Sequence, residues 1–257
     1  MDQVFSFHRF ILLLKLDFAE NGKRNILSFT VILGIMVLLM NPYIDFDKIQ
    51  LEPTFLHLLA LCIAMFCGSL LTSLTFSKYS DAAQCIAAIS LPASQTEKFL
   101  AILFTNLLFM TLLIGLFFVM HFTFTDIINE MNPKSRMITK LPANVATVLG
   151  FIFFLIQASS FLGSVYFVKS AYIKTAAVLL GTVIFIFLVN STMVSQLSDT
   201  TLYVQGNPFM SWNFSRNGRY FSVQYSESYL KFIETFMVSG LISLWFIAYV
   251  RLKEKEI

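Results

Sequence analysis

Six long apolar runs dominate the pattern of hydrophobic and polar positions along the chain. They lie near residues 26–44, 54–76, 99–122, 144–168, 175–195 and 232–250. A helix needs about 20 mostly apolar residues to cross the hydrocarbon core of a bilayer, and each run has that length or nearly so. The first is the weakest, because Asn41 and Pro42 interrupt it after Met40. The pattern predicts an all-α polytopic membrane protein with six transmembrane helices.

A different pattern precedes the first run. Its apolar residues follow the spacing of one helix face, and they are Phe7, Phe10, Ile11, Leu14 and Phe18. The polar residues 21–24 would be costly to bury in lipid, and Gly22 is a typical helix end. Residues 1–24 are therefore predicted to form an interfacial helix on the membrane surface, followed by a transmembrane domain over 25–257. The alternative is a simple N-terminal extension of the first span.

The segment between the second and third runs carries its own helix signals. Ser80 and Asp81 can cap a short helix over residues 81–89. Pro92 ends it, because a residue that precedes proline avoids the helical region. Ser94 and Glu97 then match a capping box at the start of the third span, and Lys98 is expected at the water line. The similar LPAN segment predicts Asn144 as the cap of the fourth span.

Composition supports the membrane class and excludes several others. The chain has 57% hydrophobic and 13% charged residues, whereas a soluble domain has about 25% charged residues. A net charge of +3 gives no reason to expect nucleic acid. The three cysteines show no disulfide framework or metal-ligand spacing, and the sequence holds no nucleotide-binding or hydrolase motif. We therefore expect no catalytic residue, metal or cofactor in this chain.

The distribution of basic residues predicts the orientation. If the N-terminus lies in the cytoplasm, most of the 18 Lys and Arg residues also lie on that side, as the positive-inside rule requires. Both termini are then cytoplasmic. The segment 196–231 becomes an outer loop that is rich in aromatic residues, and its Tyr and Trp residues are typical of the membrane–water boundary.

Small and polar residues inside the spans have two interpretations. Small residues recur at four-residue spacing as Ala64, Gly68 and Thr72, then as Ser159 with Gly163 and Ser160 with Ser164. Such spacing favours close packing of helices in lipid. The sharper alternative is that Asn106, Gln157 and Ser160 line a polar path for a substrate. Glu234 is a further candidate, because acids within a membrane are often functional.

The layout of the chain resembles the membrane subunits of the type-2 permease family of ABC transporters. The likeness lies in the N-terminal interfacial helix, the six spans and the long segment before the sixth span. It also lies in the LPASQTEKFLA stretch, similar to the Leu-Pro-x-Ser segment that leads those permeases into their third span. The resemblance implies that residues 81–89 form a helix that couples to a separate ATPase. The implied coupling residues are Asp81, Gln84, Cys85, Ile86, Ile89, Leu91, Pro92, Ser94, Glu97 and Lys98, together with Arg9, Lys15 and Glu20 of the N-terminal helix.

The same resemblance implies the partners. ATP and Mg²⁺ would be bound by a partner ABC ATPase subunit, and two permease chains, identical or paralogous, would form an exporter in lipid of the bacterial cytoplasmic (inner) membrane. A non-transport scaffold or anchoring subunit of an envelope complex remains open. An intramembrane enzyme is disfavoured, because the spans hold no obvious pair of ionisable residues.

Overall fold

The protein is a bundle of long helices. The computed structural model describes residues 5–41, 52–75, 92–131, 140–167, 170–198, 204–207, 211–216, 219–224 and 226–255. Within these ranges six helices are long and apolar enough to cross a membrane, which confirms the predicted all-α polytopic class. They are α1 (Phe7–Met40), α2 (Pro53–Ser73), α4 (Gln95–Met131), α5 (Ala143–Tyr166), α6 (Ala171–Ser198) and α7 (Glu227–Lys255).

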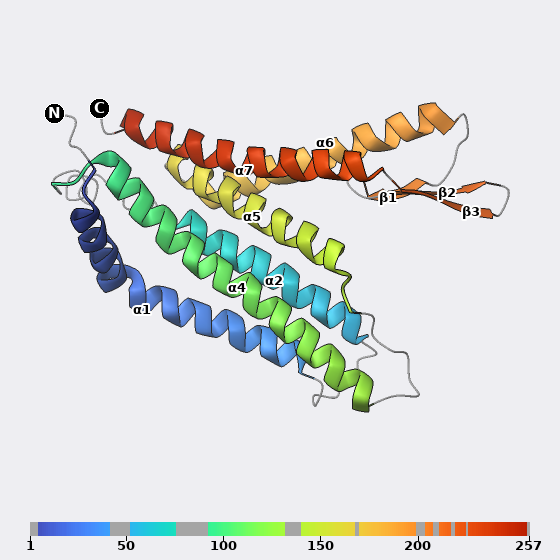
Figure 1. Ribbon diagram of the computed structural model, residues 1–257, viewed down its shortest axis with the longest axis horizontal. Coiled ribbons are helices and arrows are strands. Elements are labelled where there is room, and N and C mark those ends of the chain that lie inside the picture. Colours follow the sequence, from blue (N-terminus) through green and yellow to red (C-terminus); the bar gives the residue numbers. More distant parts are fainter. Residues whose placement is uncertain are drawn as a thin grey trace.

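The helices form two groups that meet at α5. In the first group α1 packs on α4 and α2, and in the second α5 packs on α7 and α6. Helix α5 also packs on α2, so it joins the groups (Figure 1). The first turn of α1 and the last turn of α7 lie at the same end of the bundle. We call this end the terminal end. Six spans are an even number of membrane crossings, which places both ends of the chain on the same side.

Close approach of small residues holds the helices together. A methyl group placed on Gly163 of α5 would lie 1.8 Å from Thr175 Oγ1 of α6. A methyl group on Gly68 of α2 would lie 2.8 Å from the Gln157 amide nitrogen. Ala64 and Thr72, one turn to either side of Gly68, are fully buried. These contacts support the packing interpretation of the four-residue spacing, because only small side chains let helix backbones approach this closely.

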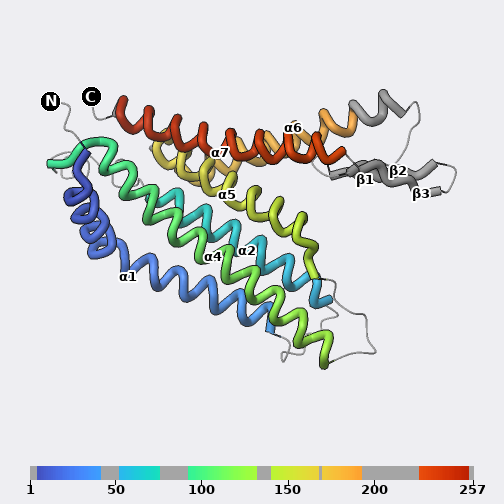
Figure 2. The backbone as a smooth tube through the Cα atoms, in the orientation of Figure 1, coloured from blue at the N-terminus to red at the C-terminus, as the bar shows by residue number. Residues whose placement is uncertain are grey.

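Helix α1 differs from the prediction that a surface helix ends at Gly22. It is one continuous helix of 34 residues, and a bend divides it (Figure 2). The rings of Phe18 and Phe29 both lie 6.2 Å from the ring of Phe109, although a straight helix would separate residues 18 and 29 by about 16 Å. A glycine inside a helix costs only about 1 kcal/mol relative to alanine, which does not end a helix that packs on both sides of the bend.

Two helix ends test the predicted boundaries of the spans. Helix α1 ends at Met40, and Asn41 is extended (φ −69°, ψ 120°), as expected for a residue that precedes proline. Helix α4 has 37 residues and continues to Met131, nine residues beyond the end of the third apolar run near residue 122. At 1.5 Å per residue α4 is about 55 Å long, much more than a hydrocarbon core of about 30 Å requires.

The segment predicted as an outer loop over 196–231 has regular structure. Helix α6 continues to Ser198, and α7 begins at Glu227. Between them β1 (Val204–Asn207), β2 (Ser211–Arg216) and β3 (Arg219–Gln224) form an antiparallel sheet in that order. In β2 and β3 aromatic and β-branched residues are frequent, and these favour strands. The described part of this segment therefore contains a small sheet, and its position outside the membrane stays a prediction.

Candidate functional site

Two polar contacts fix the register of α2 against α4. Near one end of α2 the Nδ1 atoms of His57 and His121 lie 3.0 Å apart, and both side chains are buried. Near the other end Thr72 Oγ1 lies 3.1 Å from Asn106 Oδ1. The two contacts are the same number of residues apart on both helices, so α2 and α4 run antiparallel without a shift.

This register sets the depth of each residue relative to the membrane. Helix α2 has 21 residues, about 32 Å, which matches a hydrocarbon core of about 30 Å. Its last residue, Ser73, follows the Thr72 contact directly. Helix α4 begins at Gln95, so it extends about 16 Å beyond Asn106 at the terminal end of the bundle. From this match of lengths we expect Glu97, in the first turn of α4, to lie outside the hydrocarbon.

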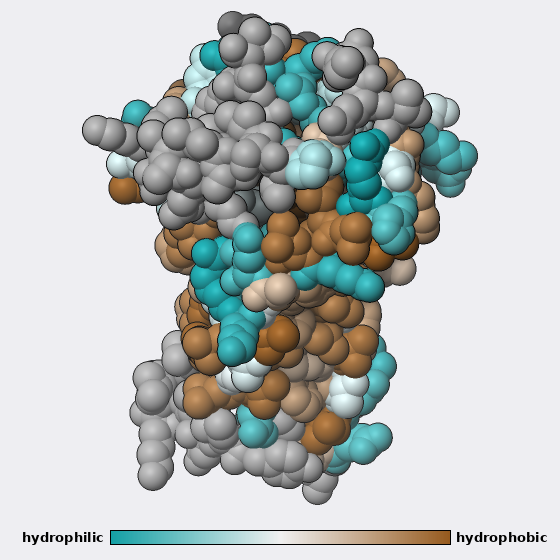
Figure 3. Space-filling view, turned by 90° about the vertical axis from the view of Figure 1, so that its left-hand side faces the viewer, coloured by the Kyte–Doolittle hydropathy of each residue, from teal (hydrophilic) through white to brown (hydrophobic). Residues whose placement is uncertain are grey.

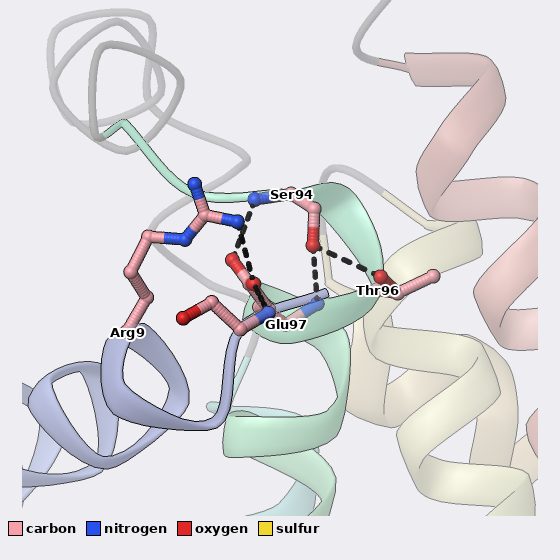
Figure 4. A network of polar contacts seen from close by, with 5 residues as sticks. Arg9, Ser94, Thr96 and Glu97 are labelled. Carbon is pink, nitrogen blue, oxygen red and sulfur yellow. Dashed lines mark hydrogen bonds and ion pairs between the residues drawn. The ribbon is translucent and has the colours of Figure 1, made fainter. Parts of the chain in front are cut away.

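Glu97 is the centre of a polar network that joins α4 to α1 (Figure 4). Its side chain is completely buried. Oε1 accepts hydrogen bonds from the Ser6 backbone N–H (2.5 Å) and from Arg9 Nη2 (3.1 Å). Oε2 accepts one from the Ser94 backbone N–H (2.8 Å). We call these four residues the Glu97 junction; it ties the first turn of α1 to the first turn of α4.

The network contains the predicted capping box. The Glu97 backbone N–H donates to Ser94 Oγ (3.2 Å), while the Glu97 side chain accepts from the Ser94 N–H. The Ser94 hydroxyl also lies 3.0 Å from Thr96 Oγ1. This reciprocal pairing satisfies two of the N–H groups that a helix start leaves without intrahelical partners. The prediction for Ser94 and Glu97 is confirmed.

The other predicted coupling residues fall into three groups. Lys15 and Glu20 are exposed on α1, and Pro92 is exposed before α4. Lys98, predicted at the water line, is buried at the start of α4 and only 6% exposed. The remaining predicted coupling residues, Asp81, Gln84, Cys85, Ile86, Ile89 and Leu91, lie outside the described residues.

One predicted helix cap is wrong. Helix α5 begins at Ala143, with Pro142 in the N-cap position and no side-chain cap. Asn144 Oδ1 instead accepts from the adjacent Val145 N–H (2.9 Å). The LPAN segment therefore differs from the Ser94 segment: proline's fixed φ suits a helix start without any side-chain cap.

The structure brings together two of the four predicted path residues. Thr72 Oγ1 lies 2.7 Å from Gln157 Oε1 and 3.1 Å from Asn106 Oδ1, so α2, α4 and α5 meet at a buried polar triad. The Gln157 amide nitrogen has no hydrogen-bond partner among the described residues. Ser160 is buried one turn away on α5, and Glu234 is exposed on α7. These four residues therefore do not form one site.

The histidine pair was missed by sequence reasoning. His121 Nε2 accepts from the Leu141 backbone N–H (3.3 Å), so its Nδ1 carries the hydrogen and donates to Nδ1 of His57. No local pattern in the sequence marks this pair, because the two residues are 64 positions apart and the register of α2 against α4 is a tertiary feature. Among the residues that the structure describes, no group of three or more His, Cys, Asp or Glu side chains could hold a metal ion.

A pocket of about 40 Å³ lies at the terminal end, where α1, α2 and α4 meet. Asn106 of the polar triad lines it from α4, and Asp17 and Arg24 line it from α1. The geometry thus provides a fixed junction outside the hydrocarbon, a buried triad near its edge, and a pocket beside the triad. No protein-family model, curated protein or solved structure matches the chain.

Proposed function

We propose that this chain is the transmembrane (permease) subunit of an ATP-binding-cassette transporter, working as an exporter in the bacterial cytoplasmic membrane. Two such chains, identical or paralogous, would pair, and a separate ATPase subunit would bind ATP and Mg²⁺. The six candidate membrane-spanning helices support this proposal. The sequence-level resemblance of the segment around Leu91 to the type-2 permeases points in the same direction.

The Glu97 junction is the observation that carries the proposal. It lies directly after the predicted coupling segment, and it bonds the start of α4 to the start of α1. A force applied to the residues before Ser94 would move both helices together, because Glu97 is buried and held by donors from both. Rigid-body displacement of packed helices is a common way to convert a local event into a change of state.

The test is co-purification of an ATPase. The tagged chain, isolated from its native membranes in mild detergent, should bring with it a subunit that has a Walker A motif. Ile86→Asp should abolish this association, because it places a charge in the predicted contact helix. Lys253→Asp is the matched control: it changes an exposed charge at the same end of the bundle and should leave the complex intact.

Two outcomes would contradict the proposal. If no ATPase accompanies the wild-type chain, the assignment to a transporter of this class is wrong. If Ile86→Asp and Lys253→Asp retain the ATPase equally, the contact is not made by residues 81–89. A stable complex whose ATPase activity drives no transport in vesicles would instead favour the anchoring subunit.

A further inference from the structure

The pocket at the terminal end lies at the depth of lipid headgroups. Leu71, in the last turn of α2, and Thr75, just beyond that helix, both line it. Helix α2 is about as long as the hydrocarbon core is thick. A pocket at the end of α2 therefore lies where the hydrocarbon gives way to the polar headgroups.

The α1 side of the pocket carries both signs of charge. Asp17, Asn21 and Arg24 all line it. The Asn21 side chain connects the two ions: its Nδ2 donates to Asp17 Oδ1 (2.6 Å), and its Oδ1 accepts from Arg24 Nη2 (3.1 Å). The bridging amide keeps the carboxylate and the guanidinium apart, so the two do not neutralise each other in a direct ion pair. Arg24 is exposed and Asp17 is half-buried, so the guanidinium is the more accessible of the two charged groups.

Apolar side chains line the pocket together with these polar groups. Phe29 of α1 and Phe109 of α4 line it and contact each other at 6.2 Å between ring centroids. Ile102 of α4 also lines the pocket, about two helical turns closer to the terminal end than Phe109. All three are half-buried, so they present apolar surface beside the charged groups. Figure 3 shows this end of the molecule, where hydrophilic residues (teal) lie between hydrophobic ones (brown).

We propose that this pocket binds one phospholipid with a zwitterionic, hydrogen-bonding headgroup, such as phosphatidylethanolamine. The phosphate would lie on Arg24, whose guanidinium recognises phosphate oxygens through paired N–H groups. The ammonium would donate to the carboxylate of Asp17, and the first part of an acyl chain would lie along Phe29 and Phe109. The space of about 40 Å³ is smaller than the headgroup, so the phosphate and the ammonium would bind at its charged rim, and most of each acyl chain would stay in the bilayer.

The charge pattern selects among lipids. An anionic lipid such as phosphatidylglycerol offers the phosphate but no ammonium, so Asp17 would gain no partner. Phosphatidylcholine has a quaternary ammonium that cannot donate a hydrogen bond to the carboxylate. The proposal does not depend on the transport function, because it rests on the pocket and its charges alone.

The experiment is native mass spectrometry of the full-length chain in detergent with added lipids of each class. Phosphatidylethanolamine should be retained in preference to phosphatidylcholine and phosphatidylglycerol. Asp17→Asn and Arg24→Gln should each weaken its retention about tenfold, the effect of losing one hydrogen bond to a charged group. Lys23→Gln is the control, because Lys23 is exposed beside this segment but does not line the pocket; it should retain the lipid as the wild type does.

Separate controls test whether each variant folds and whether the bound molecule is a lipid or a free headgroup. Arg24→Lys keeps the charge and should retain more lipid than Arg24→Gln, and every variant must elute as a single species in size-exclusion chromatography. Equal retention of the three lipids, or retention unaffected by Asp17→Asn, would overturn the proposal. If soluble phosphoethanolamine binds as tightly as the lipid, the pocket takes a small zwitterion and the lipid assignment is wrong.

Discussion

Replacing Glu97 by alanine should destabilise the fold more than any other change at the Glu97 junction. The carboxylate is completely buried and accepts hydrogen bonds from two backbone N–H groups and from Arg9. A hydrogen bond to a charged group contributes about 1.5–3 kcal/mol. The Arg9 side chain is 34% exposed, so its ion pair contributes about 1 kcal/mol or less. Because water can partly replace Glu97 at the two N–H groups, we expect a loss of about 2–4 kcal/mol in the free energy of unfolding.

Two neighbouring substitutions set the scale. Ser94→Ala removes the hydroxyl that caps the Glu97 N–H but keeps the carboxylate, so it should cost about 1 kcal/mol. Arg9→Gln removes the partly exposed charge and should cost about 1 kcal/mol or less. Glu97→Gln keeps one carbonyl oxygen and the side-chain volume, so it should fall between Glu97→Ala and Ser94→Ala.

The assay is denaturant unfolding of the purified chain in one fixed detergent, followed by helical circular dichroism. Glu234→Ala is the control, because that side chain is exposed on α7 and a surface change usually costs within about 0.5 kcal/mol. If Glu97→Ala costs no more than Glu234→Ala, the junction does not hold α1 against α4. If Arg9→Gln costs as much as Glu97→Ala, the ion pair rather than the backbone donors is the main contribution.

Three further substitutions test the interior of the bundle by the same unfolding measurement. Gly163→Ala should lower the free energy of unfolding by about 1–3 kcal/mol, because the new methyl group would overlap Thr175. Adding Thr175→Ala should restore part of this loss. If the two substitutions show no coupling, the contact is refuted. Thr72→Val should cost about 1–3 kcal/mol by leaving two buried amides without the hydroxyl between them, whereas a neutral effect would mean that the triad is hydrated. His121→Leu should cost more than the double change of His57 and His121 to leucine, because the single change leaves one buried ring without its partner; the reverse order would contradict the pairing.

Local patterns in the sequence predicted the features that depend on nearby residues. The six apolar runs gave the spanning helices, because helix length in a membrane follows from hydrocarbon thickness. The Ser94–Glu97 capping box is confirmed for a similar reason: its two partners are three residues apart. The sequence Asn217–Gly218 between β2 and β3 is a strong signal for a hairpin and could have predicted that part of the sheet.

Contacts between distant segments could not be predicted in this way. Arg9 and Glu97 were both expected to face an ATPase, yet they bind each other across 88 residues of sequence. His57 and His121 are 64 residues apart, and no local pattern marks either one. Gly22 has the sequence of a helix end, but packing of α1 on both sides of the bend outweighs its low helix propensity. In each case the tertiary register, which the sequence does not display, decides the outcome.

The buried triad also bears on where a transporter of this kind would place its substrate path. A path through one chain would have to separate α2 from α4 and α5. That movement would break the contacts of Thr72 with both amides and the close packing at Gly68. A path between two chains would leave these contacts intact and would use the faces of α6 and α7, which are largely exposed in the single chain. Buried polar side chains that bond to one another hold helices together in lipid. They do not line a path along which a solute could move. We infer that the substrate path of the proposed exporter lies between two copies or paralogues of this chain, and not within one.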